Sequence, residues 1–222
     1  TDLADSGAVK NVADVKGKTM IANIDPKTGG HGIIASKMLA TANLTIDDVE
    51  WLTLPLPQTA DALANKKADT AYLFEPFVTL ITDRKVAVKW QNGADYYPGE
   101  EIGAQVFAQK FMEERPEVAK RWMVAEMRGA RDFIDYQKTG KDKEIITPIL
   151  VNATHLAADV LPRIQWIPAN PDGAMNTGPL VDDQKYLLDW GTIKQTFPID
   201  QIYDPRFVDY AVQQLGKYNP SK

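Results

Sequence analysis

The sequence predicts an α/β fold, with a parallel, helix-flanked sheet in its first half and a mainly helical second half. The first observation is that strand-like apolar runs alternate with helix-like segments between residues 19 and 90. The second is that the connections between these segments are short, which is typical of parallel βαβ units with right-handed crossovers. The third is that helical spacing dominates from Pro116 onward, where almost no strand pattern remains.

A glycine-rich turn joins the first predicted strand, residues 19–24, to the first predicted helix. A Pro/Gly loop at 25–30 separates them, and the helix has apolar residues at helical spacing: Ile33, Ile34, Met38 and Leu39. Gly29 and Gly30 at this turn permit a ligand to approach the backbone closely. The first N–H groups of the helix have no intrahelical partner and, together with the helix dipole, suit an anion or a polar oxygen.

Thr28 and His31 flank the glycine pair, and each has two interpretations. Thr28 either caps the helix or offers its hydroxyl group to a ligand, and His31 is either a ligand contact or a surface residue. A protonated histidine in the first turn opposes the dipole, so a helix alone does not favour one there. The order Gly-Gly-His-Gly matches neither the dinucleotide-binding glycine pattern nor a phosphate-binding loop, which disfavours nucleotide binding.

The remaining elements of the first half continue this alternation. Strands are predicted at 49–54, 70–74 and 86–90, with helices at 58–66 and from Glu75 and Pro76 onward. In parallel sheets, ligands gather beyond the carboxyl ends of the strands. The loops at 25–31, 54–58 and 74–76 are therefore expected to line one rim of the sheet.

The second half is predicted to contain one extended return strand, residues 102–108, and five helices. The helices are expected at 117–138, 143–152, 156–161, 182–190 and 205–215, with Thr154 as a cap. The aromatic side chains of the long helix are expected in the core, and the broad apolar faces of the set require a sheet or other helices to cover them. A turn-rich loop at 95–99 contains Tyr96 and Tyr97, which either close over a ligand or pack on their own lobe.

Composition narrows the classes of function. The 222 residues carry a formal net charge of -5 without a basic block, which argues against nucleic acid or an anionic membrane as the main partner. The chain has no cysteine and two histidines far apart, which argues against a cysteine nucleophile and against a metal site. No apolar run approaches the length of a membrane span, and no signal peptide pattern is present. Neither a cofactor nor a metal is therefore expected.

An ordered set of short motifs covers nearly the whole chain. In the first half they are Asp14-Val-Lys-Gly-Lys18, the strand with its Gly-Gly-His helix start, Asp47-Asp-Val49, Leu54-Pro55, Asp61-Ala-Leu63, Ala68-Asp69 and Glu75-Pro76. In the second half they are Phe111-Met-Glu-Glu-Arg-Pro116, Leu188-Asp-Trp-Gly191, Tyr203-Asp204 and residues 207–211. No motif is specific alone, but together they resemble the solute-binding proteins of ABC importers, specifically the nitrate/sulfonate/taurine and thiamine-precursor group.

The resemblance implies a periplasmic-binding-protein-like fold, with two α/β lobes joined by crossing strands and a solute held between them. It implies an approach or hinge segment at 1–11, a complete α/β lobe with a parallel or mixed sheet at 12–104, and a return strand with the helical part of the other lobe at 105–222. It also implies that a strand-rich upstream half of that other lobe is absent from the chain. The chain alone is therefore expected either to associate non-specifically through exposed apolar surface or to be covered by a partner, and to bind solute weakly.

The resemblance also assigns the site residue by residue. It implies that Thr28, Gly29, Gly30 and His31 contact the anion or polar head of the solute, that Leu54, Pro55 and Leu56 line the neighbouring wall, and that Phe74 and Glu75 face the cleft beside the hinge. A charge at the start of a helix, facing solvent, is an equally good interpretation of Glu75. The nature of the solute stays open between an oxyanion or carboxylate and a flat organic ring.

The function implied by the resemblance is capture of a small solute, without catalysis, on the periplasmic or extracellular face of the membrane. The expected partners are ABC permease subunits, and the membrane is contacted only through them or through a lipid anchor outside this chain. Two alternatives on the same fold remain. One is an extracytoplasmic sensor module of a receptor, and the other is an enzyme, either a cysteine-dependent desulfinase or a thiamine-pyrimidine-synthase-like protein.

Overall fold

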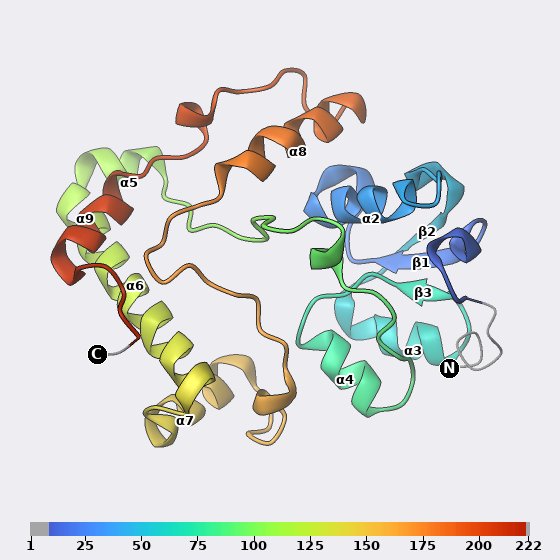
Figure 1. The fold of residues 1–222 in the computed structure, drawn as a ribbon, viewed down its shortest axis with the longest axis horizontal. Coiled ribbons are helices and arrows are strands. Elements are labelled where there is room, and N and C mark those ends of the chain that lie inside the picture. The colour runs from blue at the N-terminus through green and yellow to red at the C-terminus, as the bar shows by residue number, and fades with distance from the viewer. Residues whose placement is uncertain (1–8, 221–222) are drawn as a thin grey trace. The chain divides into compact units, whose positions relative to one another are not determined.

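The computed structural model describes residues 9–220, which form two compact units (Figure 1). The first unit contains the chain up to Ile102 together with Ile164–Trp166 and Gly178–Phe197. The second contains Gly103–Arg163, Ile167–Thr177 and the C-terminal part from Pro198 onward. Most of the predicted approach segment, residues 1–8, lies outside the described residues.

A three-stranded parallel sheet organises the first unit. Its strands are β1 (Thr19–Ala22), β2 (Glu50–Thr53) and β3 (Thr70–Ala71), in the order β2-β1-β3. Thr19 pairs with Glu50 in one ladder and Met20 pairs with Thr70 in the other, both parallel. The prediction that residues 19–24, 49–54 and 70–74 share one parallel sheet is confirmed, although β3 is shorter than expected.

The strand order determines where helices and loops lie. The connection from β1 to β2 contains α2 (Gly30–Ala40), and the connection from β2 to β3 contains α3 (Thr59–Ala64). Because β2 and β3 flank β1 on opposite sides and such crossovers are right-handed, the two helices cover opposite faces of the sheet, as Figure 1 shows. The chain therefore adds β2 on one side of β1 and β3 on the other side. The direction of winding reverses between β1 and β3, and the loops that follow these two strands flank this point.

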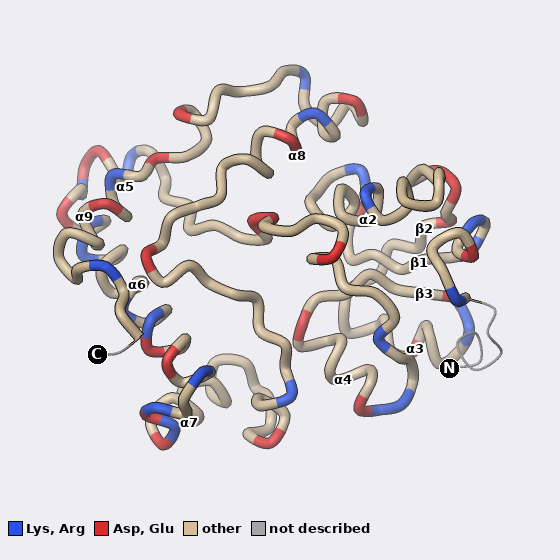
Figure 2. The backbone as a smooth tube through the Cα atoms, in the orientation of Figure 1, with Lys and Arg blue, Asp and Glu red and all other residues tan. Residues whose placement is uncertain are grey.

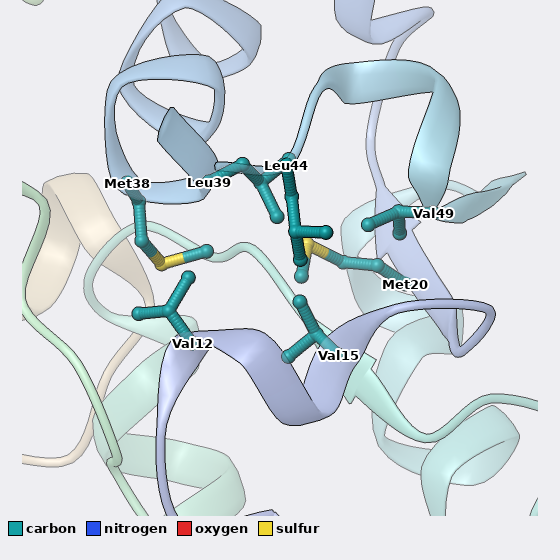
Figure 3. Close-up of a cluster of buried hydrophobic side chains, with 7 residues drawn as sticks. All are labelled: Val12, Val15, Met20, Met38, Leu39, Leu44 and Val49. Atoms are coloured by element: carbon teal, nitrogen blue, oxygen red, sulfur yellow. The ribbon is translucent and has the colours of Figure 1, made fainter. Parts of the chain in front are cut away.

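Seven buried side chains form the core on the α2 face of the sheet (Figure 3). Val15 and Leu39 are fully buried, and Met38 lies against Val12 from the turn η1 (Val12–Val15). The others are Met20, Leu44 and Val49. Truncating one such large apolar side chain to alanine costs about 2–5 kcal/mol, so this cluster fixes α2 on the sheet.

Two predicted strands are wrong. Residues 86–90 and 102–108 are irregular or extended without strand pairing. Val88 and Val106, which the apolar pattern placed in strands, are 54% and 79% exposed. An alternating pattern makes a strand only when a neighbouring strand accepts its N–H and C=O groups. The first of these segments follows α4 (Phe77–Asp83), and the second precedes α5 (Gln109–Glu114).

Four of the five helices predicted in the second half are found, although the one predicted at 182–190 begins at Thr177. They are α6 (Pro116–Thr139), α7 (Lys143–Thr154), α8 (Thr177–Asp189) and α9 (Arg206–Leu215). Pro116 opens α6 and left-handed Gly140 follows its end, as helix signals require. The predicted helix at 156–161 is wrong, since this stretch contains a turn before the 3-10 helix η6 (Leu161–Arg163). Thr154 is also not an N-terminal cap, because no helix begins directly after it among the described residues: its hydroxyl group donates to the Leu150 carbonyl within α7 and accepts from the Leu156 N–H group at 3.3 Å.

The core of the second unit lies between α6 and α9. Met127 of α6 packs with Val208 and Ala211 of α9, and partly buried side chains extend this contact. The expectation that the aromatic residues of the long helix are core residues is wrong for Trp122, which is 52% exposed. Ile145 and Ile149 of α7 are also exposed, so several apolar positions of these two helices are not covered within the described residues.

Candidate functional site

The candidate site lies where the winding of the sheet reverses. In open parallel sheets, ligands bind beyond the carboxyl ends of the strands at such a switch point. Here the loop after β1 leads through the turn η2 (Pro26–Thr28) into α2, and the loop after β3 contains Tyr72 and Phe74. The strand order β2-β1-β3 makes these two loops neighbours.

His31, Tyr72 and Phe74 form an aromatic cluster at this point. The ring centroid of His31 lies 6.0 Å from that of Tyr72 and 6.4 Å from that of Phe74, and the latter two are 5.5 Å apart. His31 is only 6% exposed, and its Nε2 atom is buried without a hydrogen-bond partner. The interpretation of His31 as a surface residue is therefore wrong. A buried polar atom without a partner is uncommon, which makes Nε2 a candidate ligand contact.

The environment of His31 favours its neutral form. Burial lowers the pKa of the imidazole below its ordinary value, whereas the backbone of Ile24 and the charge of Asp25 oppose this shift in part. A neutral ring has no unfavourable charge interaction with the positive end of the α2 dipole. One ring nitrogen of neutral histidine is a hydrogen-bond acceptor and the other is a donor.

The first turn of α2 offers free backbone donors. The N–H groups of Gly32 and Ile33 both donate to the Gly29 carbonyl, at 3.1 and 3.4 Å. Within residues 9–220, no acceptor bonds to the N–H groups of Gly30 and His31. Such groups at the start of an eleven-residue helix suit a polar or anionic ligand.

Thr28 does not cap this helix. The cap position is held by Gly29, and no side chain bonds to the first turn there. The Thr28 hydroxyl group instead donates to the Asp25 carbonyl at 2.6 Å, which closes the exposed turn η2. A contact between Thr28 and a ligand stays a prediction.

Other groups closely approach two glycines of the motif. A Cβ atom added to Gly32 would lie 1.6 Å from the Pro26 carbonyl oxygen, so the loop after β1 folds directly onto the helix. A Cβ atom on Gly30 would lie 2.6 Å from Oε1 of Glu100. A Cβ atom on Gly29 would meet only the Ile24 and His31 side chains, at 3.3 Å or more. The structure therefore explains Gly32 by backbone packing, whereas a side chain at position 30 would meet only the end of the flexible Glu100 side chain.

The other predicted site residues are divided between two strand ends. Leu54, Pro55 and Leu56 follow β2, which flanks β1 on the side opposite β3. The Leu54 N–H group donates to the Ala22 carbonyl and extends the ladder, Pro55 is exposed, and Leu56 begins the 3-10 helix η4 (Leu56–Gln58). They are at the same edge of the sheet as the aromatic cluster but are not members of it.

Glu75 is already engaged by backbone groups. One carboxylate oxygen accepts a hydrogen bond from the Thr79 N–H group at 3.0 Å, and the other accepts from the Gln165 N–H group at 3.4 Å. The first bond satisfies a donor in the opening turn of α4. The half-buried carboxylate thus has a structural task, and its contact with a ligand stays a prediction.

Sequence reasoning missed a second group of residues along α2. Lys37 of α2 lies 4.0 Å above the Tyr97 ring, and the Tyr97 hydroxyl group donates to Asp183 of α8 at 2.8 Å. Burial and the Asp183 charge raise the pKa of Glu100 to about 7, and Lys37 opposes this effect. Tyr97 is buried, so packing on its own unit is the correct one of the two interpretations. Only Tyr97 had a sequence signal, because the other partners come from distant segments.

The surface chemistry outside the site is mixed. Basic and acidic residues are interspersed along the chain in both units (Figure 2). Between residues 9 and 220, no group of three or more His, Asp or Glu side chains is arranged to hold a metal ion. In the same stretch, no helix combines the length and the apolar character that crossing a membrane requires.

Comparisons with solved structures identify the fold. The sulfonate-binding protein SsuA of Methylobacillus flagellatus KT, described as periplasmic, has a TM-score of 0.64 at 16% identity, over 93% of this chain and 63% of its own. The alkanesulfonate-binding protein SsuA of Xanthomonas axonopodis pv. citri, bound to MOPS, has a TM-score of 0.54 at 19% identity, over 70% of this chain and 50% of its own. The desulfurization enzyme DszB has a TM-score of 0.56 at 14% identity, over 92% of this chain and 73% of its own.

These likenesses establish a periplasmic-binding-protein-type α/β fold, as the sequence predicted. The chain spans about half of the first SsuA structure that it matches and 63% of the second. No protein of curated function matches the sequence. A sequence model of the NMT1-like family matches residues 2–150, about two thirds of the chain, and the chain therefore belongs to the NMT1-like family.

Proposed function

We propose that this chain belongs to the solute-binding component of an ABC importer. It captures a small polar or anionic organic solute and presents it to permease subunits, on the periplasmic or extracellular face of the membrane. The family and the SsuA-like fold support this role. The proposed contacts of the first unit are the backbone of Gly29 and Gly30, the His31 ring and the Phe74 ring, with Thr28, Leu54, Pro55, Leu56 and Glu75 as further candidates.

The observation that carries the proposal is the coincidence of free donors and a free ring nitrogen at one switch point. The N–H groups of Gly30 and His31 have no acceptor among residues 9–220, and Nε2 of His31 is buried without a partner. Leaving a buried polar atom unpaired costs about 1–3 kcal/mol, and a ligand that pairs with it recovers this cost. Tyr72 and Phe74 add an apolar wall of the kind that small-molecule sites combine with a few polar groups.

The two histidines permit a direct test by NMR. We expect small molecules retained by the protein during purification to be identifiable by mass spectrometry. Adding the identified solute to protein labelled with 15N at histidine should shift the ring signals of His31. His155 is the matched internal control, because it is exposed and belongs to the second unit. A solute that shifts neither ring, or only His155, would contradict the proposed site.

Matched variants extend the test to affinity. His31→Asn should weaken solute binding at least ten-fold, because it removes the ring that bears Nε2. His155→Asn should leave affinity unchanged. Circular dichroism of both variants should match the parent chain, which separates a lost contact from a lost fold.

The DszB likeness makes catalysis the alternative to test. The absence of cysteine from the sequence supports binding without turnover over a cysteine-dependent reaction. The same NMR sample answers the question, because a solute that is only bound keeps its own spectrum over hours. Conversion that outlasts repeated purification of the protein would favour the enzyme.

A further inference from the structure

The Glu100 carboxyl group lies at the start of α2, inside the site proposed above. Glu100 belongs to the segment after the turn η5 (Gly93–Asp95). Its Oε1 atom would be 2.6 Å from a Cβ atom on Gly30, so the carboxyl group lies beside the first helical turn. A side chain at position 30 would require the Glu100 side chain to move.

Glu100 lies in a charged cluster of two carboxyl groups, its own and that of Asp183, and one cation, Lys37. Asp183 of α8 interacts unfavourably with the charged form of Glu100, whereas Lys37 of α2 interacts favourably with it. The phenols of Tyr72 and Tyr97 also lie in the field of Glu100 and stay neutral, since their pKa values are raised.

The other charged groups near Glu100, Asp183 and Lys37 do not reverse the negative net charge of this cluster. Asp182 of α8 interacts with Lys37 but is paired with Lys185 at 2.9 Å. Burial favours the neutral form of the His31 ring, and Asp25 is the charge that acts on it. Lys37 is thus the cation that faces two carboxyl groups, Glu100 and Asp183, within the described part of this unit.

We propose that Glu100 determines the specificity of the α2 site, and that the site prefers a head group that donates hydrogen bonds, such as an amine or amidine, over a bare oxyanion. This inference rests on the proposed function. The positive end of α2 already has a carboxylate beside it, so an added oxyanion meets like charge there. A cationic N–H group instead forms a charge-assisted hydrogen bond with Glu100. The Nε2 atom of His31, buried without a partner in the same turn of α2, is an acceptor that also suits an N–H donor rather than an oxyanion.

Two probes with the same ring and opposite head groups test this inference. Benzamidine is a cationic N–H donor, and benzenesulfonate is an oxyanion. Calorimetric titration of the full chain at pH 8 should give an affinity for benzamidine at least ten-fold higher than for benzenesulfonate. Glu100→Gln should lower the benzamidine affinity about ten-fold, as expected for one lost charge-assisted hydrogen bond, and should raise that for benzenesulfonate.

Asp95→Asn is the matched control, because Asp95 is exposed, lies in the preceding turn and loses the same charge. It should change neither affinity by more than about two-fold, as expected for an exposed charge. The inference is overturned if the unsubstituted chain prefers benzenesulfonate, binds neither probe, or keeps its preference in Glu100→Gln.

The His31→Asn variant distinguishes this failure from failure of the proposed function. If His31→Asn weakens a probe and Glu100→Gln leaves the preference unchanged, the site stands and the role of Glu100 is wrong. If His31→Asn leaves the affinity of every bound probe unchanged, both the site and the role of Glu100 are wrong.

Discussion

Replacing Gly32 by alanine tests whether the loop after β1 folds onto α2 as described. In an ordinary helix interior, glycine to alanine stabilises a protein by about 1 kcal/mol. At Gly32 the new Cβ atom would lie 1.6 Å from the Pro26 carbonyl oxygen, whereas ordinary contact begins at 3.4 Å. The difference, 3.4 minus 1.6 Å or about 1.8 Å, must come from movement of the backbone, since neither partner is a flexible side chain.

The expected cost follows from these two opposing effects. Overpacking of a close-packed site costs about 1–3 kcal/mol and more where backbone must move, which exceeds the helix preference. Because backbone must move here, the upper part of that range applies, about 2–3 kcal/mol, and subtracting the helix preference of about 1 kcal/mol leaves a net destabilisation of about 1–2 kcal/mol. With a urea dependence of about 2 kcal/mol per molar, the unfolding midpoint should fall by about 0.5–1 M.

Gly129→Ala provides the matched control within the same chain. Gly129 lies inside α6, and a Cβ atom there would meet nothing within 4 Å. This variant should be as stable as the parent or more stable, by up to about 1 kcal/mol. Urea unfolding followed by circular dichroism measures both variants, and hydrogen exchange locates the effect in α2. A Gly32→Ala protein as stable as Gly129→Ala would refute the described contact with Pro26.

Three further predictions concern polar contacts. Arg131→Met should destabilise the second unit by about 2–4 kcal/mol, because its mostly buried guanidinium donates to Asp172 and to two backbone carbonyls; an unchanged thermal midpoint would exclude this role. Tyr97→Phe should cost about 1–2 kcal/mol in urea unfolding through its lost bond to Asp183, and a cost near zero would contradict that bond. The pKa of Glu100 is higher in the folded chain than in the unfolded chain. The Glu100 carboxyl group therefore contributes to stability below about pH 4.5, and this contribution is lost as the pH rises to about 7. Glu100→Gln should remove about 1 kcal/mol of this pH dependence, after allowance for solvent screening, and titration curves parallel to the parent would contradict it.

The sequence predicted the elements whose signals are local. The Pro/Gly turn before α2, the apolar spacing of its core face and the proline that opens α6 each identified an element correctly. The two incorrect strands had the apolar residues of a strand, but pairing depends on a neighbour that no local pattern records. The helix predicted at residues 156–161 was wrong because a short apolar stretch is equally compatible with a turn.

For the candidate site, the sequence could indicate residues that lie close together along the chain, but not residues that only the fold brings together. Gly29, Gly30 and His31 lie together in one turn, so the motif itself identifies them as candidates, and Phe74 becomes a candidate from its place at a strand end. Burial of His31 had no sequence signal, because it arises from contact with Tyr72, more than forty residues later. Glu100 and Asp183 were missed for the same reason, since neither lies in a recognisable motif and the fold alone brings them to α2.

The bond between Tyr97 and Asp183 has a consequence for the order of events during synthesis. Its two residues are 86 positions apart, and nearly all of residues 103–177 between them belong to the second unit. A ribosome must therefore release most of the chain before α8 can join the sheet-containing unit. Until then, the Tyr97 ring and the apolar residues Ile33 and Ile34 beside it lack part of their cover from α8. Contacts this distant in sequence form slowly, so closure of this unit is expected to be a late step of folding.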